Sequence, residues 1–367
     1  MAIEDTSVHS KRTIPVYLFA GFLGSGKTTL LSQVIDYYKA AGVKAAVIMN
    51  ELGEVNLDGQ LVDEDVPMAE MLSGCICCTI RGDLSLEVKQ LIEEHQPDVV
   101  LIESTGAANP LEIIDAVTET AIYARIDLHK VVTVVDGPEL LARSRRGGRT
   151  YKLMQDQIRC ATDLIINKAD LINPEELVEI QQLVRELNAY APLTVTIRCV
   201  TDMALFDLSQ QAELKQAQTV HEQGHHSCGT NCSHEEQNHL HNSEHDHRHG
   251  HDCGHDQHDH PHDAADHSNA AHHHSHEHVM TLTHYLGGPV DSHAFEAVIA
   301  ALPQEIYRAK GIVTFADTNS RFLFQYAYRE TEFTRITPQG DVNDVVVFIG
   351  EHFAKDELEQ KLLQLEQ

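Results

Sequence analysis

Residues 16–28 read Val16-Tyr17-Leu18-Phe19-Ala20-Gly21-Phe22-Leu23-Gly24-Ser25-Gly26-Lys27-Thr28, an apolar run followed directly by a glycine-rich loop. The end of this stretch, from Gly21 onward, matches the pattern G-x-x-x-x-G-K-[ST], and a helix-like pattern continues to about Ala41. The glycines let backbone N–H groups curl around phosphate oxygens, and the start of a helix adds a favourable dipole. The stretch therefore predicts a strand, a phosphate-binding loop and a helix, in that order.

Further apolar runs repeat this alternation along the first half of the chain. Compact, β-rich runs at 43–49, 99–102, 131–135 and 164–166 are separated by segments of helical length. Apolar strands that alternate with helices are typical of a parallel sheet covered on both faces. We therefore expect an α/β fold of the P-loop NTPase type, in which helices flank a parallel sheet.

The composition changes abruptly after this region. Of the 26 histidines, 20 lie between His221 and His278, in a span with 11 carboxylates and a single basic residue, Arg248. Such a segment has almost nothing to bury, which is typical of a disordered, metal-binding linker. Beyond it, strand-like runs at 279–286, 312–315, 322–328 and 345–349 and helical patterns at 292–302 and 354–365 indicate a smaller α+β domain.

The expected organisation thus has four parts. A flexible N-terminus covers 1–13, the P-loop domain 14–210, the His-rich linker 211–278 and the C-terminal α+β domain 279–367. The length of 367 residues agrees with two domains and a linker, because a single core rarely grows that large.

The bulk composition excludes several classes of function. Binding a nucleic-acid backbone needs clustered Lys and Arg, so a formal net charge of −29 argues against a nucleic-acid partner. No apolar run approaches the roughly 20 residues that cross a bilayer, and the first 11 residues lack the apolar core of a signal peptide. We therefore expect no membrane partner and a cytoplasmic location, where the eight cysteines are thiols or metal ligands.

Two further motifs follow strand-like runs, at the edge where an open α/β sheet binds its ligand. The run 99–102 ends in Glu103-Ser104-Thr105-Gly106, an acidic element suited to Mg²⁺ with a glycine free to meet the γ-phosphate. The run 164–166 ends in Asn167-Lys168-Ala169-Asp170. The Asp170 carboxylate can accept hydrogen bonds from N1–H and the 2-amino group of guanine, which adenine cannot supply. The motifs in this order predict GTP as the nucleotide.

These motifs assign roles to individual side chains. Lys27 should reach the β- and γ-phosphates, while Thr28 and Glu103 should hold Mg²⁺. The stretch 50–59 stands where a nucleotide-sensing switch loop belongs, and its Asp58 is a candidate for a Mg²⁺ or water contact, although an ordinary turn before Gly59 fits better. The candidate catalytic residues are Lys27, Glu103 and Asp58. The predicted GTP-binding residues are Gly21, Gly24, Ser25, Gly26, Lys27, Thr28, Thr29, Gly106, Asn167, Lys168 and Asp170.

A cysteine cluster lies between the switch stretch and Glu103. Cys75, Cys77 and Cys78 place three soft ligands within four residues, directly after Gly74. Thiolates at this density suit Zn²⁺, Cu(I) or similar ions. A redox pair and buried packing cysteines are the alternative interpretations.

No second cysteine pair lies near this cluster in the sequence. Cys160 and Cys199 stand alone in apolar or β-like surroundings, and we expect both to be core residues. A structural zinc site would need a second ligand pair at a fixed spacing. An incomplete set, with the fourth position left to Glu54, water or a ligand from a client, favours a site of metal transfer.

With these motifs assembled, the chain closely resembles the CobW-type GTP-binding metallochaperone family, which is related to HypB and UreG. The resemblance rests on 21–28, 50–59, 103–106, 167–170 and the signature Gly74-Cys75-Ile76-Cys77-Cys78, and it extends to the His-rich insertion and the C-terminal segment. It implies a slow GTPase in which nucleotide state and metal binding are coupled through the switch loop, with Glu54 as an added metal-site carboxylate. Many relatives carry Glu just before the Asn of the switch stretch, but Met49 stands here, so that position is assigned no metal role.

The family that the chain resembles serves several metals and clients. The histidines favour Zn²⁺, because neutral imidazole is a good ligand for it, while nickel and cobalt stay open. His226, Cys228, Cys232 and His234 are candidates for one auxiliary site. We expect a GTP-dependent zinc chaperone with an unidentified metalloenzyme client and a nucleotide-dependent homodimer. The alternatives are a zinc or nickel storage or buffering protein, a cobalt chaperone in cobalamin biosynthesis, and a small-molecule kinase, which the guanine motif disfavours.

Overall fold

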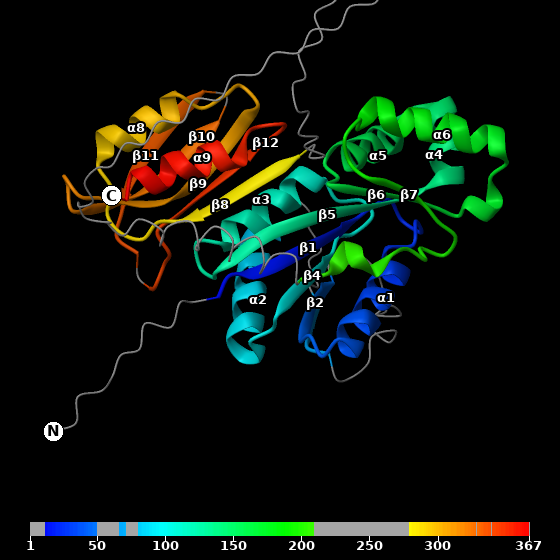
Figure 1. Ribbon diagram of the computed structural model, residues 1–367, viewed down its shortest axis with the longest axis horizontal. Coiled ribbons are helices and arrows are strands. Elements are labelled where there is room, and N and C mark those ends of the chain that lie inside the picture. The colour runs from blue at the N-terminus through cyan, green and yellow to red at the C-terminus, as the bar shows by residue number, and fades with distance from the viewer. Residues whose placement is uncertain are drawn as a thin grey trace, which may run out of the picture. The chain divides into compact units, whose positions relative to one another are not determined.

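The computed structural model describes residues 12–49, 66–70, 80–208, 279–327, 329–338 and 340–366. Within these ranges the strands form two sheets (Figure 1), one of seven strands in the order β3-β2-β4-β1-β5-β6-β7 and one of five in the order β11-β10-β9-β12-β8. Every pairing in the first sheet is parallel, and every pairing in the second is antiparallel. The expected fold class is therefore confirmed.

The seven-stranded sheet takes its strands from the first half of the chain. They are β1 (Ile14–Ala20), β2 (Ala45–Met49), β3 (Met68–Glu70), β4 (Val99–Glu103), β5 (Ile126–Asp136), β6 (Asp163–Asn167) and β7 (Leu193–Val195). The associated helices are α1 (Lys27–Ala40), α2 (Ile80–His95), α3 (Pro110–Thr120), α4 (Gly137–Arg146), α5 (Arg149–Arg159) and α6 (Pro174–Leu187), with short 3₁₀ turns η2 (Ala169–Leu171) and η3 (Met203–Phe206).

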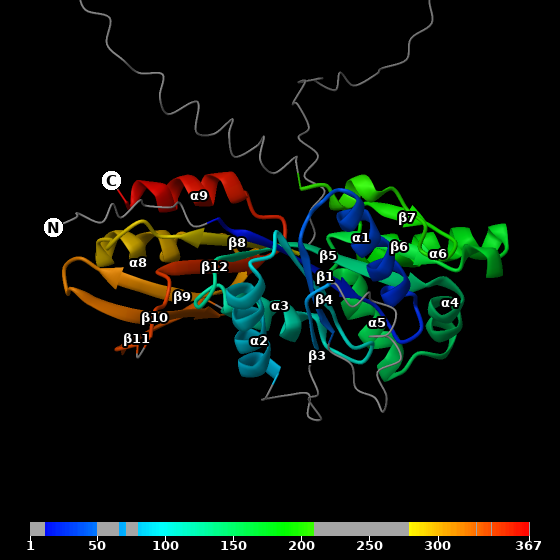
Figure 2. The ribbon, with the colours of Figure 1, turned by 90° about the horizontal axis from the view of Figure 1, so that it is seen from below.

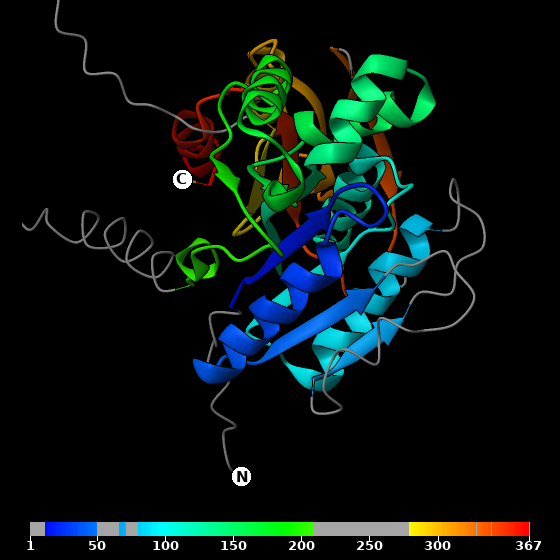
Figure 3. The ribbon, with the colours of Figure 1, turned by 90° about the vertical axis from the view of Figure 1, so that its right-hand side faces the viewer.

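Side-chain alternation along β1 shows how helices cover this sheet. Val16 and Leu18 belong to one apolar cluster with residues of α2 and α3. Tyr17 points to the opposite face, where its ring lies 5.6 Å from that of Phe206 in η3. Tyr38 of α1 donates its hydroxyl hydrogen to the Phe206 carbonyl at 2.7 Å, and α1 runs alongside β1 and β2 (Figure 3). Both faces are thus covered, which is why these strands read as continuous apolar runs.

The five-stranded sheet is built from β8 (Met280–Tyr285), β9 (Ile306–Phe315), β10 (Ser320–Ala327), β11 (Glu330–Ile336) and β12 (Val345–Gly350). Helices α8 (Ser292–Ala300) and α9 (Lys355–Gln364) cover one face (Figure 2), where they share an apolar cluster with alternate residues of the strands. The sequence pattern does not reveal β11. Most of its side chains are exposed, so they show none of the apolar alternation by which a half-buried strand is recognised.

The opposite face of the five-stranded sheet packs on the half of the chain that forms the seven-stranded sheet. Ile312, Val345 and Val347 belong to the same apolar cluster as the buried side of α3. The Tyr285 hydroxyl accepts from the Ile126 N–H at 2.8 Å. Residues 209–278, with the expected His-rich linker, lie outside the described residues. Among the helices of the described ranges, none combines the length and the apolar composition that a bilayer crossing requires.

Candidate nucleotide-binding site

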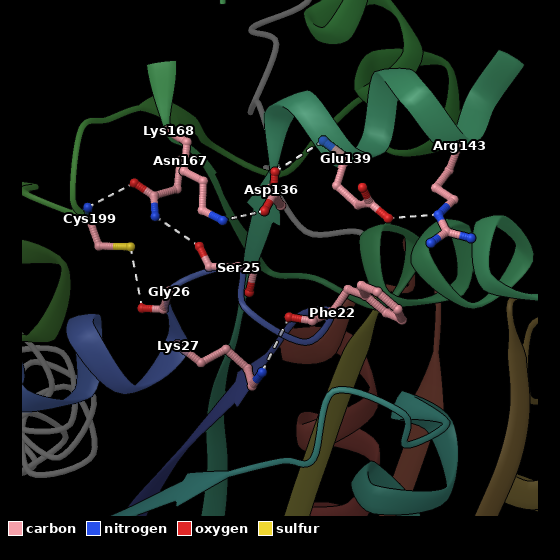
Figure 4. Close-up of polar contacts among 10 residues, drawn as sticks. All are labelled: Phe22, Ser25, Gly26, Lys27, Asp136, Glu139, Arg143, Asn167, Lys168 and Cys199. Carbon is pink, nitrogen blue, oxygen red and sulfur yellow. Dashed lines mark hydrogen bonds and ion pairs between the residues drawn. The ribbon is translucent and has the colours of Figure 1, made fainter. Parts of the chain in front are cut away.

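The glycine-rich loop connects β1 to α1, as the motif predicts. Gly24 and Gly26 have φ angles of 74° and 112°, a region that L side chains rarely adopt. A Cβ on Gly26 would lie 2.5 Å from the Asn167 Nδ2 atom, so the loop approaches β6 too closely for any other residue. Lys27 is only 6% exposed, and its ammonium donates to the Phe22 carbonyl at 3.4 Å (Figure 4).

Glu103 reaches the same edge at the end of β4, where it pairs in register with Phe19 of β1. The Thr28 hydroxyl donates to the Glu103 Oε1 atom at 2.8 Å, and Glu103 is 8% exposed. A hydroxyl and a carboxylate supply the hard oxygen donors that Mg²⁺ takes in proteins. The residues present therefore fit the predicted Mg²⁺ ion, in chemistry and in mutual reach.

Asn167, the last residue of β6, ties three segments together in the buried part of the site (Figure 4). Its Nδ2 donates to the Ser25 carbonyl at 2.8 Å. Its Oδ1 accepts from the Cys199 N–H at 2.9 Å and from the Thr196 hydroxyl at 3.3 Å. The first residue of the predicted guanine motif thus joins the glycine-rich loop to the segment that follows β7.

The next residues of the guanine motif turn outward. Lys168 has φ 63° and ψ 37°, and its ammonium contacts the Asp136 Oδ2 atom at 2.5 Å. Asp170 lies in η2 and is exposed, which leaves its carboxylate accessible to a ligand. The sequence pointed to Lys168 and Asp170, but it did not reveal Asp136 as the partner of Lys168.

Gly106 meets the glycine-rich loop from the side of β4. A Cβ on Gly106 would lie 2.4 Å from the Leu23 nitrogen, so the two loops are in contact. The Gly106 carbonyl accepts from the Gln157 Nε2 atom of α5 at 3.2 Å. The loop after β4 is therefore held between the glycine-rich loop and α5.

The structure thus brings the predicted residues of the nucleotide motifs together, while the predicted zinc ligands and Asp58 lie outside the described residues. Residues from the three nucleotide motifs converge at the carboxyl ends of β1, β4 and β6, with Thr29 exposed beside them. The remaining predicted residues lie outside the described residues: Glu54, Asp58, Cys75, Cys77, Cys78, His226, Cys228, Cys232 and His234. In the part of the chain that the structure describes, no group of three or more His, Cys, Asp or Glu side chains is placed to hold a metal ion.

Four supporting residues escaped the sequence-based prediction: Asp136, Gln157, Thr196 and Cys199. Asp136 carried a usable signal, because it follows the apolar run 131–135 just as Glu103 follows 99–102. Cys199 is fully buried, as expected for a core residue, yet its thiol also contacts the Gly26 carbonyl at 3.4 Å. Burial raises the pKa of the Cys199 thiol to about 12, and the charge of the nearby Lys168 opposes that rise.

Comparison with curated proteins identifies several relatives. The chain is 31% identical over 254 residues to the zinc-regulated GTPase metalloprotein activator 1 of Dictyostelium discoideum, covering 58% of this chain and 53% of that protein. It is 30% identical over 232 residues to the zinc chaperone CobW of Pseudomonas aeruginosa, covering 55% and 61%. It is 33% identical over 166 residues to the zinc chaperone YeiR of Escherichia coli, covering 45% and 49%. The chain thus spans about half to three fifths of the length of these relatives.

Two family descriptions match the chain in the order in which the two sheets occur. "CobW/HypB/UreG, nucleotide-binding domain" matches residues 15–195, the range that holds the seven-stranded sheet. "Cobalamin synthesis protein cobW C-terminal domain" matches residues 279–366, the range of the five-stranded sheet. Together they account for most of the chain and confirm the resemblance drawn from the motifs. The chain belongs to the CobW/HypB/UreG family and carries a CobW-type C-terminal domain.

Proposed function

We propose that the chain binds and slowly hydrolyses GTP, and that this cycle controls the delivery of a zinc ion to a client protein. The convergence of the nucleotide motifs carries the proposal: Thr28 bonds Glu103, and Asn167 bonds the Ser25 carbonyl. The names of the curated relatives, zinc chaperones and a zinc-regulated GTPase metalloprotein activator, point the same way.

GTP would lie across the carboxyl ends of β1, β4 and β6. The backbone from Gly21 to Thr29 would surround the phosphates, and Gly106 would face the γ-phosphate. The exposed carboxylate of Asp170 would accept from N1–H and the 2-amino group of guanine. This assignment of the base predicts a strong preference for GTP over ATP.

Charge at the phosphates would be balanced by Lys27 and by Mg²⁺. Thr28 and Glu103 would hold the ion, which when bound offsets the negative charge on the β- and γ-phosphate oxygens. Burial of Lys27 keeps bulk water away from its ammonium group, so its attraction for phosphate is weakly screened. Asp58, outside the described residues, stays the candidate for contact with the ion or the attacking water.

The transferred metal would be held by Cys75, Cys77 and Cys78, and the fourth position would be exchangeable between Glu54, water and a ligand from the client. Three thiolates bind Zn²⁺ firmly, and an open fourth position lets a ligand from the client take part in an exchange. The auxiliary set His226, Cys228, Cys232 and His234 would gather metal in the linker. All of these residues lie outside the described part of the chain.

The proposal includes a division of labour along the chain. Residues 14–210 would form the GTPase domain, 211–278 the linker that collects metal and 279–367 the domain that contacts a client metalloenzyme. We place the reaction in the cytoplasm and propose a homodimer that forms with bound nucleotide.

The proposal is tested by measuring whether metal binding and GTP hydrolysis are coupled. GTP hydrolysis would be measured with and without Zn²⁺ for the parent chain, for Cys77→Ala and Cys78→Ala, and for Cys253→Ala in the His-rich segment. We expect zinc to change the rate in the parent and in Cys253→Ala but not in the other two variants. Reciprocally, GTP should change zinc affinity by the same factor as zinc changes GTP affinity. An unaltered zinc response in both Cys77→Ala and Cys78→Ala would refute the coupling.

Metal storage is a second candidate function, favoured by the 20 histidines between His221 and His278. Deletion of residues 221–278 separates the two functions. Storage predicts that nearly all bound zinc is lost. A chaperone should retain one tightly bound zinc ion per chain, measured by metal analysis after dialysis.

A further inference from the structure

Asp136 ends β5 at the same edge as the nucleotide motifs, and its two carboxylate oxygens have different partners (Figure 4). Oδ1 accepts from the Glu139 N–H at 3.0 Å and so caps the first turn of α4. Oδ2 contacts the Lys168 ammonium at 2.5 Å. Asp136 is 7% exposed and the Lys168 side chain is 35% exposed, so the carboxylate is buried and the ammonium group approaches it from the half-buried rim of the site.

Lys168 needs such an anchor because of its backbone. Its φ of 63° and ψ of 37° place it in the left-handed region, which a residue with a side chain occupies only when its surroundings hold it there. The left-handed turn directs the chain into η2, which carries Asp170. Asp136 and Asn167 are register partners on β5 and β6, so the carboxylate stands directly beside the start of this turn.

The two residues before Ala169 are therefore held by separate contacts. Asn167 is bonded to the Ser25 carbonyl, and Lys168 is paired with Asp136. Asp170 itself is exposed. The position from which the Asp170 side chain extends is therefore set by the backbone of the residues that precede it.

We propose that Asp136 is a positioning residue for base recognition: through Lys168 it holds the left-handed turn from which Asp170 contacts guanine. The inference rests on the proposed function and deepens it, because it adds a residue outside the three motifs to the selection of GTP. It requires no contact between Asp136 and the nucleotide.

The two partners of Asp136 allow the positioning role to be separated from helix capping. Asp136→Asn retains an oxygen that can accept from the Glu139 N–H. It replaces the other oxygen by an NH₂ group, which cannot accept from an ammonium. Asp163→Asn is the matched control: Asp163 also pairs with a lysine across β5 and β6, since its carboxylate lies 3.3 Å from Lys130, but at the opposite end of β6.

The first readout is nucleotide selectivity, measured by fluorescence titration with labelled GTP and ATP. We expect Asp136→Asn to weaken GTP binding about tenfold, which corresponds to ~1.4 kcal/mol, while ATP binding stays within about twofold. Asp163→Asn should match the parent. In a double-mutant cycle, Lys168→Met combined with Asp136→Asn should lose little more selectivity than Lys168→Met alone. Unchanged selectivity in Asp136→Asn, or additive losses in the cycle, would overturn the inference.

The second readout needs no nucleotide and therefore separates failure of this inference from failure of the proposed function. The N–H groups of Ala169 and Leu171 donate within the turn region, to the carbonyls of Thr196 and Lys168. Hydrogen exchange at these amides in the nucleotide-free chain should speed up in Asp136→Asn and not in Asp163→Asn.

Nucleotide selectivity and amide exchange together distinguish failure of the guanine assignment from failure of the role proposed for Asp136. If the parent binds GTP and ATP equally, the guanine assignment fails, and amide exchange still decides whether Asp136 holds the turn. If Asp136→Asn does not fold, Lys168→Met, which leaves the cap of α4 intact, must show the faster exchange. Exchange equal to that of the parent would refute the role of the ion pair.

Discussion

Single polar residues at strand ends connect separate segments of this site, in addition to the roles that their motifs predict. The Asn167 amide satisfies acceptors and donors from both the glycine-rich loop and the segment after β7. Cys199 contacts both sides of this junction: its backbone N–H donates to the Asn167 Oδ1 atom, and its thiol contacts the Gly26 carbonyl. A buried thiol that contacts a carbonyl is stable as the neutral S–H, which agrees with its raised pKa of about 12.

At the residue scale we therefore expect Cys199 to resist alkylation. Alkylation needs the thiolate, and with a pKa of about 12 only a fraction on the order of 10⁻⁴ is ionised near pH 8. Peptide mapping after treatment with iodoacetamide should show Cys199 unmodified in the folded chain and modified in urea. Cys160, whose pKa burial also raises to about 12, is the internal control. Labelling of Cys199 at equal rates in both conditions would contradict the buried contact.

The raised pKa of Cys199 also makes the stability of the folded chain depend on pH. The folded-state pKa lies above the ordinary thiol value of 9.0, so the contribution of Cys199 to stability is complete below that value. It is lost as the pH rises from about 9 toward about 12, because the unfolded chain releases the proton first.

At the scale of elements, the site depends on the close approach of two loops. The loop after β4 touches the glycine-rich loop at Gly106 and is held from behind by Gln157 of α5. Any shift of the loop after β4 therefore displaces the backbone of the glycine-rich loop at Leu23.

Gly106→Ala should accordingly impair nucleotide binding. Its Cβ would lie 2.4 Å from the Leu23 nitrogen, so one of the two loops must move. We expect GTP affinity to fall by at least about tenfold, in keeping with the cost of small displacements in a preorganised site. Gly288→Ala, whose Cβ would meet nothing within 4 Å, is the control and should bind like the parent. Parental GTP affinity in Gly106→Ala, measured by the same fluorescence titration, would show that the contact is not needed.

At the scale of the molecule, a charge cluster centred on the buried Lys310 and Asp115 joins the five-stranded sheet to α3. Lys310 of β9 contacts the Asp115 and Glu119 carboxylates of α3 at 3.0 and 3.2 Å, and Arg308 contacts Asp115 from the same strand at 3.0 Å. Burial lowers the pKa of Lys310, and the two carboxylates oppose that change. Because α3 follows the loop of Gly106, the cluster connects the nucleotide edge to the C-terminal sheet.

Lys310→Met should destabilise the protein, because it leaves the buried Asp115 with one cation fewer. Removing one partner from a buried pair costs about 3 kcal/mol, which urea unfolding would detect as a lower midpoint. Replacement of Arg159, whose pair with Asp156 is half exposed, should cost under about 1 kcal/mol. Adding Asp115→Asn to Lys310→Met should recover part of the loss. A loss no larger than that of the Arg159 variant would show that the cluster is not a stabilising contact.

Local patterns in the sequence were sufficient for the parallel sheet and the nucleotide motifs. Strands buried on both faces of a sheet are recognised in the sequence as continuous apolar runs. A glycine-rich loop between a strand and a helix is typical of a phosphate-binding loop. The pattern also placed Glu103 and Asn167 at the ligand-binding edge, since parallel strands end at the same side of a sheet. These features depend on residues that are neighbours along the chain.

Only the tertiary structure revealed the partners of those residues. Asp136 and Lys168 are brought together by the pairing of β5 with β6, and Lys310 meets Asp115 only when β9 packs on α3. The exposed strand β11 is likewise defined by its pairing with β10, because its own side chains carry no pattern. The sequence by itself determined the fold class and the kind of ligand, through periodicity and motif. Ion pairs, buried hydrogen bonds and edge pairing were decided by the fold, because they join residues that nothing in the local sequence connects.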